Sequence, residues 1–355
     1  MKKVSFFSML AAAALMMGVT SCNKEGGSNP GSDLKQVSIK IAGVIQSGTR
    51  AVEAPGETAA GTIQLTGGHI FVIDPLGAVT HNEALNVAQA TNTGQTLGAQ
   101  VPADSRVYII GNIPAADQAA IAGLTNWSGI QAATSAMTTQ GDYTEAALAN
   151  SNGAPAAITV TGTTTATATV SIKPLISRLE LVQVKGGANI KAFTVTGVYV
   201  DSYYPSFTYG GSYSGTIFSQ GQGGTFSGIG DAGTWAATGT PLVASPDLGL
   251  GDNELWAHNV ASGGLPRFII ALTGIKYDDG GTEVDLGNTT SYYLTVTGYT
   301  GVTAFERGKI YRIGGTNGIT FDEDDLGLTP NPVDIDLTLT VSIEEWVLVT
   351  PNAEL

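Results

Sequence analysis

The stretch Val333-Asp-Ile-Asp-Leu-Thr-Leu-Thr-Val-Ser-Ile343 has the clearest strand pattern in the chain. Large apolar residues occupy every odd position and polar residues every even position, which is typical of a β-strand with one buried face. Taken alone, this stretch is the closing strand of the C-terminal half. Other short strands with glycine-rich turns, and no regular helices between them, predict an all-β fold.

A second alternating pattern lies near the N-terminus, where we expect folding to start at Leu34. Val37, Ile39 and Ile41 alternate with polar residues, which predicts a half-buried strand. The pattern ends in the loop Gln46-Ser-Gly-Thr-Arg50, and a second loop covers 51–61. No further lysine or arginine follows Arg50 until Arg106, which begins an apolar stretch and is expected to be shielded in a strand.

The remaining patterns predict two antiparallel β-sandwich domains with minor helical insertions. We place the boundary near 175, so that one domain covers 51–175 and the other 176–355. Helices are expected at Ala115–Leu124, entered through Pro114, and at Ser128–Met137. Further strands are expected at Thr62–Leu65, His69–Asp74, Arg106–Gly111, Ile158–Gly162, Thr165–Ile172, Ser177–Lys185, Ala192–Val200, Phe268–Lys276, Tyr292–Gly298 and Lys309–Ile313.

The first 21 residues are typical of an export signal. Two lysines precede an apolar stretch, 6–19, that is shorter than the ~20 residues of a membrane-spanning helix. Val19-Thr-Ser-Cys22 resembles the lipobox of bacterial lipoproteins, which implies cleavage before Cys22 and a lipid, such as palmitate, attached there; a buried structural cysteine is the alternative. Cys22 is the only cysteine, so no internal disulfide can form. The residues after it, 22–33, are typical of a flexible tether.

The charge balance excludes one class of partner. The chain has 30 acidic and 16 basic residues, a formal charge of -14, and loss of Lys2 and Lys3 makes this -16. Nucleic acid and anionic membrane surfaces are therefore not expected to bind.

No catalytic or cofactor motif is found in the sequence. The three histidines, His69, His81 and His258, have no metal-ligand spacing, and no phosphate-binding loop or nucleophile motif occurs. We therefore expect no metal, no cofactor and no enzymatic activity. A secreted hydrolase with dispersed carboxylates remains an alternative.

Aromatic residues gather between Tyr199 and Trp235. Tyrosine and tryptophan can form an adhesive or glycan-binding surface, but packing in the core or between domains is the interpretation we prefer. The residues are Tyr199, Tyr203, Tyr204, Phe207, Tyr209, Tyr213, Phe218, Phe226 and Trp235.

Several motifs in order resemble the fimbrillins, the lipoprotein-derived pilins of type V fimbriae in Gram-negative oral and gut bacteria. The resemblance spans nearly the whole chain and implies two transthyretin-like β-sandwich domains and an extracellular filament subunit. The motifs are Val101-Pro-Ala103, Val107-Tyr-Ile-Ile-Gly-Asn-Ile-Pro114, Ser177-Arg-Leu-Glu-Leu181, Val195 to Tyr204, Arg307-Gly-Lys-Ile-Tyr-Arg-Ile313 and the strand ending at Trp346.

The resemblance also implies a maturation step, in which an arginine-specific protease cuts in the loop after the first strand. Arg50 is the only arginine between Cys22 and Arg106, and Ala51 would become the new N-terminus. Flexible, accessible loop backbone suits a protease. In an unrelated protein the same arginine would simply be solvated.

Cleavage after Arg50 would remove the strand of Val37, Ile39 and Ile41 together with the lipid anchor. It would leave 10 basic and 28 acidic residues, a charge of -18. The open groove is a template for a strand from a second copy, added head to tail. The donor strand is expected at about 333–349, with inward side chains Val333, Ile335, Leu337, Leu339, Val341 and Ile343.

The predicted function is thus a fimbrial subunit that supports adhesion and biofilm formation. Its precursor would be an outer-membrane lipoprotein and its mature form extracellular. The expected partners are copies of itself, related fimbrial subunits, the arginine-specific protease and a host protein or glycan. The alternatives are a tip or anchor subunit, or a surface glycan-binding lipoprotein that does not polymerise.

Overall fold

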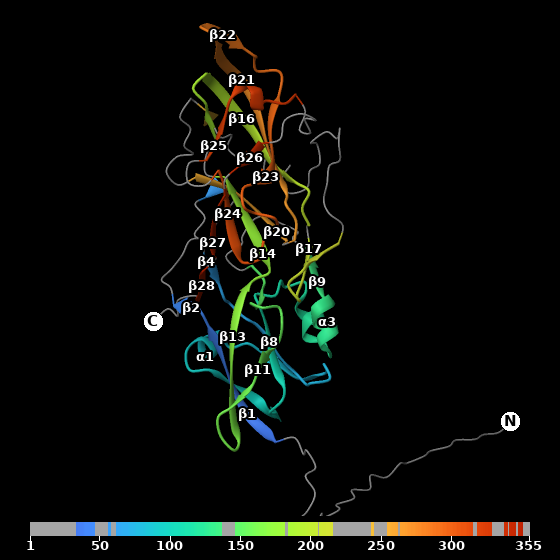
Figure 1. The fold of residues 1–355 in the computed structure, drawn as a ribbon. Helices are drawn as coiled ribbons and strands as arrows, with labels where there is room; N and C mark the ends of the chain where they lie inside the picture. The colour runs from blue at the N-terminus through green and yellow to red at the C-terminus, as the bar shows by residue number, and fades with distance from the viewer. Residues whose placement is uncertain are drawn as a thin grey trace, which may run out of the picture.

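The computed structural model shows an elongated chain with its N-terminal half at one end and its C-terminal half at the other (Figure 1). It describes residues 33–46, 56–57, 62–136, 146–181, 184–204, 206–215, 243–244, 254–261, 263–314, 318–328, 337–339, 341–345 and 347–350.

The N-terminal half is built on one large sheet. Its strands follow the order β6-β5-β8-β10-β13-β1-β7, so that β1 lies inside the sheet, near one end of this order. Two short strands lie off this path, β11 (Ala156–Ala157) on β8 and β12 (Thr159–Val160) on β13. The main strands are β1 (Leu34–Ala42), β5 (Gly68–Ile73), β6 (Val79–Ala84), β7 (Gln95–Pro102), β8 (Arg106–Gly111), β10 (Leu148–Asn150) and β13 (Thr165–Pro174).

The C-terminal half contains two larger sheets and a short pair. The first sheet comprises β27 (Val341–Glu345), β24 (Lys309–Ile313), β14 (Ile176–Leu181), β20 (Glu254–Ala261) and β3 (Gly56–Glu57). The second comprises β19 (Val243–Ala244), β16 (Ile190–Asp201), β21 (Arg267–Asp279), β23 (Tyr292–Tyr299) and β26 (Leu337–Leu339), with β22 (Thr282–Asp285) on β21. The pair is β15 (Val184–Gly186) and β25 (Ile319–Phe321).

Two small sheets join segments that are far apart in the sequence. One is formed by β18 (Tyr213–Ser214), β17 (Ser206–Thr208) and β9 (Thr134–Ala136). The other is formed by β2 (Val44–Gln46), β28 (Val347–Thr350) and β4 (Thr62–Gln64). The second sheet therefore brings the C-terminal strand beside two N-terminal ones.

The helices among the described residues are short. They are α1 (Val87–Thr91), α2 (Gln118–Ala122), α3 (Trp127–Ala132) and the 3-10 turn η2 (Glu323–Asp325). The side chains of Asn86 and Asn126 accept hydrogen bonds from the first turns of α1 and α3, so asparagine caps start these helices.

Both predicted helices exist but their bounds were wrong. The first begins at Gln118 with Asp117 as its N-cap residue, because 114–117 form a turn first. The second ends at Ala132, because Thr134–Ala136 pairs as strand β9 with β17, a partner about 70 residues away.

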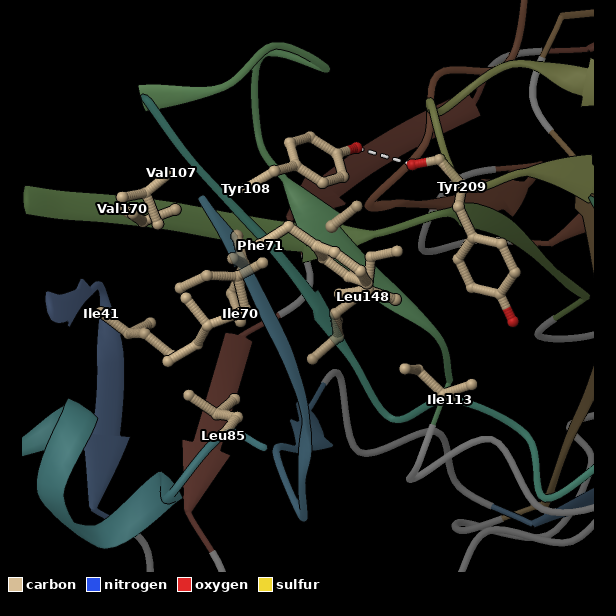
Figure 2. Packing of buried hydrophobic residues seen from close by; sticks show 14 of the residues in the cluster. Ile41, Ile70, Phe71, Leu85, Val107, Tyr108, Ile113, Leu148, Val170 and Tyr209 are labelled. Atoms are coloured by element: carbon tan, nitrogen blue, oxygen red, sulfur yellow. Dashed lines mark hydrogen bonds between the residues drawn. The ribbon is translucent and has the colours of Figure 1, made fainter. Parts of the chain in front are cut away.

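Two hydrophobic cores fill the two halves. The first gathers inward residues of β1, β5, β8, β10 and β13, and Figure 2 shows Ile70, Phe71 and Leu148 packed within it. The second gathers residues of β14, β16, β21, β23 and β24, including Phe193, Phe268 and Tyr311.

The all-β prediction is confirmed, and most predicted strands lie within a few residues of the observed ones. Arg106–Gly111 and Lys309–Ile313 have the predicted bounds. The predicted strand Ile158–Gly162 is reduced to β12. The sheets are mixed rather than purely antiparallel, because β1 runs parallel to β13, β14 to β24 and β23 to β26.

Candidate assembly site

Strand β1 lies between two other strands of the N-terminal sheet. It pairs in parallel with β13, from Gln36 opposite Thr165 to Ala42 opposite Ser171. On its other side it pairs antiparallel with β7, from Leu34 opposite Pro102 to Ile39 opposite Gln95. The first predicted strand is therefore an internal strand of the sheet, bonded along both edges.

The inward side chains of β1 are fully enclosed. Val37, Ile39 and Ile41, the residues predicted for the displaced strand, are 0%, 0% and 2% exposed. In Figure 2, Ile41 points into the core beside Ile70. At ~1.5–3 kcal/mol for each buried side chain, these three contribute roughly 5–9 kcal/mol before the cost of ordering.

We call the space that β1 fills between β13 and β7 the slot, and its β13 wall is lined by small residues. Ala166, Ala168 and Val170 are buried and stand opposite Val37, Ile39 and Ile41 in the parallel register. The alternation predicted for Thr165–Ile172 is thus confirmed. The alanines leave room for the larger side chains of β1, so β1 itself fills most of the apolar space in the slot.

Lys35 is a cation at the fourth inward position of β1. It lies on the same face as Val37, Ile39 and Ile41 and is 1% exposed. Its ammonium group lies 2.6 Å from the Asp33 carboxylate and also donates to the carbonyl of Thr163. Because a buried charge must give up its hydration, Lys35 binds this end of β1 in the slot less favourably than an apolar side chain would.

Strand β1 continues through Gly43, at φ +80°, into β2. The next described residues, Gly56 and Glu57, form β3, so the predicted processing residues Arg50 and Ala51 and the lipidation residue Cys22 lie outside the described residues. Any cut in 47–55 would separate β1 and β2 from β3, β4 and the rest of the chain.

The C-terminal tail is divided into three strands rather than one. Strand β26 pairs with β23, β27 pairs with β24, and β28 lies between β2 and β4, parallel to both. Figure 1 shows this tail running from the C-terminal half back toward the N-terminal half. Leu337 and Leu339 lie in β26 and Val341 and Ile343 in β27, whereas Val333 and Ile335 lie outside the described residues.

Strand β28 therefore pairs with one strand that precedes Arg50 in the sequence and with one that follows it. The first is β2 (Val44–Gln46) and the second is β4 (Thr62–Gln64). Loss of residues 1–50 would remove β1 from the slot and, at the same time, one of the two partners of β28.

The two ends of the N-terminal sheet, β6 and β7, are joined by side chains. Gln95 Nε2 donates to Glu83 Oε1 at 2.8 Å and to the carbonyl of Ala84 at 2.9 Å. The Asn86 N–H donates to Gln95 Oε1 at 2.7 Å, and the Gly98 N–H donates to Glu83 Oε2 at 2.8 Å. We call these contacts between β7 and residues 83–86 the β6–β7 clasp.

The environment of Glu83 favours its ionised form. Partial burial opposes ionisation, but hydrogen bonds with His81, the Gly98 N–H and Gln95 outweigh it and hold the pKa of Glu83 below its usual value. His81 Nε2 lies 2.7 Å from Glu83 Oε2 on the same strand. The clasp is therefore built around a carboxylate.

The junction between the halves is closely bonded. The Tyr108 hydroxyl donates to the Tyr209 carbonyl at 2.6 Å (Figure 2), and the Arg307 guanidinium donates to the carbonyls of Asn150 and Ser151 at 2.7 and 2.9 Å. Burial raises the pKa of Tyr108 to about 12, partly offset by Arg307, and burial also lowers the pKa of Arg307. With the β9–β17 ladder, these contacts fix the two halves to each other.

The aromatic cluster is mostly structural where it is described. Tyr203, Phe207 and Tyr209 are buried in the two cores, as the packing interpretation predicts. Tyr213 is 43% exposed and stacks on Tyr204 at 4.0 Å. Phe218, Phe226 and Trp235 lie outside the described residues.

A half-open cavity of about 500 Å³ lies at the ends of β5 and β8. Its lining includes Asp74, Asp104, Arg106 and Trp127. Arg106 begins β8, as predicted, but its side chain is exposed rather than shielded. No sequence motif signals this site, because its residues come together from the ends of β5 and β8, from separate turns and from α3.

Two kinds of feature are absent from the described residues. No group of three or more metal-ligating side chains comes together in them. No helix in that part of the chain is long and apolar enough to cross a membrane.

Comparison with known proteins identifies the fold but no sequence relative. No protein-family model matches the chain, and no curated protein matches it in sequence. A candidate cell adhesion protein from Bacteroides eggerthii aligns over 92% of this chain and 99% of its own, with 17% identity and a TM-score of 0.56. The chain shares its fold with this solved structure.

Two further solved structures align over similar lengths. A candidate cell adhesion protein from Parabacteroides distasonis covers 91% of this chain and 99% of its own, with 11% identity and a TM-score of 0.53. A fimbrilin from Porphyromonas gingivalis covers 89% and 98%, with 11% identity and a TM-score of 0.45. The fold shared with the two cell adhesion candidates thus extends over nearly the whole chain.

Proposed function

We propose that the protein is a structural subunit of an extracellular fimbria, made as a lipoprotein precursor attached through Cys22 and activated by cleavage after Arg50. The observation that carries this proposal is the position of β1. It is an internal strand of the N-terminal sheet, and it lies wholly upstream of Arg50. A single cut would thus release a strand whose departure opens a gap between β13 and β7.

The open slot would then accept the C-terminal strand of another copy. Both of its walls would present unpaired backbone groups, which are templates for strand addition. The tail has six alternating apolar residues over Val333–Ile343, against three in β1, where the fourth inward residue is Lys35. Gross burial by the donor would be on the order of 10 kcal/mol, so replacement is favourable.

The same cut prepares the donor. Strand β28 loses β2 and keeps only β4 as a ladder partner among the described strands. A strand held along one edge separates more readily than one held along both. Because the tail of one copy fills the slot of the next, the contact does not close on itself and produces a filament.

The proposal also accounts for the rigid junction. In a filament, each subunit would transmit tension from its slot to its own tail, through both halves. Tyr108, Tyr209 and Arg307 join the halves by buried hydrogen bonds, which supports a subunit that behaves as one rod. The solved proteins of this fold named for cell adhesion agree with a non-enzymatic surface role.

The test is cleavage of the full-length precursor by an arginine-specific protease. We expect a new N-terminus at Ala51 and, with time, a ladder of detergent-resistant oligomers. A chain that is fully cut at this bond, freed of its N-terminal fragment, and still monomeric would reject the proposal.

A second candidate function is glycan binding, favoured by the cavity beside Trp127. An indole ring can lie against a sugar, while Asp74, Asp104 and Arg106 offer acceptors and donors for its hydroxyls. Binding on a glycan array that is lost in Trp127→Ala, but kept in Tyr213→Ala, would support this role. Absence of binding to any glycan would reject it.

A further inference from the structure

We propose that the β6–β7 clasp, centred on Glu83, holds β7 in place when β1 leaves, and so keeps the slot open as a strand-wide acceptor. This inference rests on the proposed function. It assigns Glu83 and Gln95 a positioning role in assembly, distinct from the contacts that the incoming strand would make itself.

The order of the sheet leaves β7 dependent on β1. Among the described strands, β7 has a backbone ladder with β1 only. Removal of β1 therefore leaves β13 still joined to β10, but leaves β7 without any ladder partner. A slot with only one fixed wall would be a poor template, because the second wall would have to be ordered during docking.

After β1 has left, the clasp holds β7 in place of the lost backbone pairing with β1. Four hydrogen bonds connect Gln95 and Gly98 of β7 to residues 83, 84 and 86, and none of them involves β1. Gln95 is 6% exposed, so its amide is buried and its partners are not readily replaced by water. Leu97 and Val101 anchor the same strand in the core.

Charge makes Glu83 the central member. An ionised carboxylate accepts stronger hydrogen bonds than a neutral group, and here its two oxygens accept from both Gln95 Nε2 and the Gly98 N–H. Gly98 lies in the middle of β7, whereas the chain connects to α1 at the Gln95 end of the strand. The hydrogen bond from the Gly98 N–H therefore holds a part of β7 that the covalent connection to α1 does not.

The experiment compares Glu83→Ala with wild type before and after cleavage, in the full chain. Chymotrypsin sensitivity at Leu97, within β7, reports the state of that strand directly. We expect both uncut precursors to be resistant. After the cut and removal of the N-terminal fragment, Glu83→Ala should be cleaved at Leu97 at least tenfold faster than wild type. Its detergent-resistant oligomers should form at least tenfold more slowly.

The matched control is Asp279→Ala, which removes an exposed carboxylate at the end of β21 that has no hydrogen-bond partner among the described residues. It should behave as wild type in both assays. Should the Glu83→Ala precursor not fold, Glu83→Gln serves instead. It keeps the side-chain shape and one acceptor oxygen, and we expect an intermediate sensitivity of about threefold or more.

The outcomes separate the two proposals. If wild type is cut but forms no ladder, the fimbrial function fails, and the Leu97 assay still tests the clasp. If cut Glu83→Ala, or cut Glu83→Gln where it is used, is as resistant at Leu97 as cut wild type within twofold, the clasp does not hold β7 and the inference is wrong.

Discussion

Strand β1 and the C-terminal tail are held by the fold in opposite ways. Strand β1 is a single nine-residue strand with ladders on both edges and a buried face. The tail is broken into strands of three, five and four residues, which belong to three different sheets. A strand bonded along both edges must leave as a unit, whereas a divided tail can detach in steps.

The difference assigns the roles in the proposed mechanism. In that mechanism the slot would stay blocked until the chain is cut, because β1 is tied to the rest of the molecule by the segment that contains Arg50. The tail is retained by short pairings, and one of them, β2 with β28, disappears with the same cut. Each side of this comparison can be tested, from the largest expected effect to the smallest.

The first prediction concerns the trigger. Arg50→Ala should abolish both the cut and the ladder when the precursor is treated with an arginine-specific protease, because β1 then stays covalently attached. Arg106→Ala is the matched control, since Arg106 lies in β8 with its backbone paired to Ile73. Gel analysis and N-terminal sequencing give the readout, and ladder formation by uncut Arg50→Ala would contradict it.

The second prediction concerns the donor. Deletion of Pro332–Leu355 should leave a chain that can be cut but cannot elongate, because it has a slot and no tail. Added to cut full-length chains, it should shorten the ladder, since it accepts a strand and offers none. Long polymers formed by the deletion variant alone would show that the donor lies elsewhere.

The third prediction separates precursor from mature chain. Ile39→Ala should lower the unfolding free energy of the precursor by about 2–5 kcal/mol, because it leaves a cavity beside Ala168. Lys40→Ala, at the exposed neighbouring position, should change it little. After cleavage both products should melt as wild type does. A persistent difference in the freed chains would mean that β1 had not left.

The fourth prediction concerns the fit of β1. Lys35→Leu should leave the precursor equally stable or raise its unfolding free energy by about 1 kcal/mol, because it replaces a buried cation with an apolar side chain. Release of the N-terminal fragment after the cut should then be slower. Faster release, measured by mass spectrometry, would show that the contacts of Lys35 with Asp33 and Thr163 retain β1.

The fifth prediction concerns the pH dependence of the clasp. Since the pKa of Glu83 is lowered in the folded chain, its stabilising effect is present above the ordinary glutamate pKa of about 4.3 and is lost as pH falls through the folded value. The difference in unfolding free energy between wild type and Glu83→Gln should therefore shrink below about pH 4. A constant difference down to pH 2 would contradict this.

The sequence alone predicted the parts of this comparison that depend on local pattern. The alternation of Val37, Ile39 and Ile41 was sufficient for β1, because one buried face sets a period of two. The continuous apolar run after Arg106 was sufficient for β8, which is buried on both faces from Val107 to Gly111. It could not show that β1 is internal to a sheet, since pairing partners are set by the whole chain.

Strand β7 was not predicted at all. Its inward positions Gln95, Leu97, Ala99 and Val101 include a buried glutamine and a small alanine, and the outward Gly98 has low strand propensity. The polar Gln95, which makes β7 hard to recognise in the sequence, is the residue that binds β7 to β6. The tail was likewise predicted as one strand, because continuous alternation cannot reveal the places where the backbone changes from one sheet to the next.

The most direct test of the central claim is a disulfide between subunits. The chain left by cleavage after Arg50 has no cysteine, so Ala168→Cys on the slot wall can be combined in turn with cysteine at Leu337, Leu339, Val341 or Ile343. We predict that at least one pair forms a disulfide between neighbouring subunits of the ladder, and only after the cut. A ladder with no such disulfide from any pair would contradict strand exchange into the slot of β1.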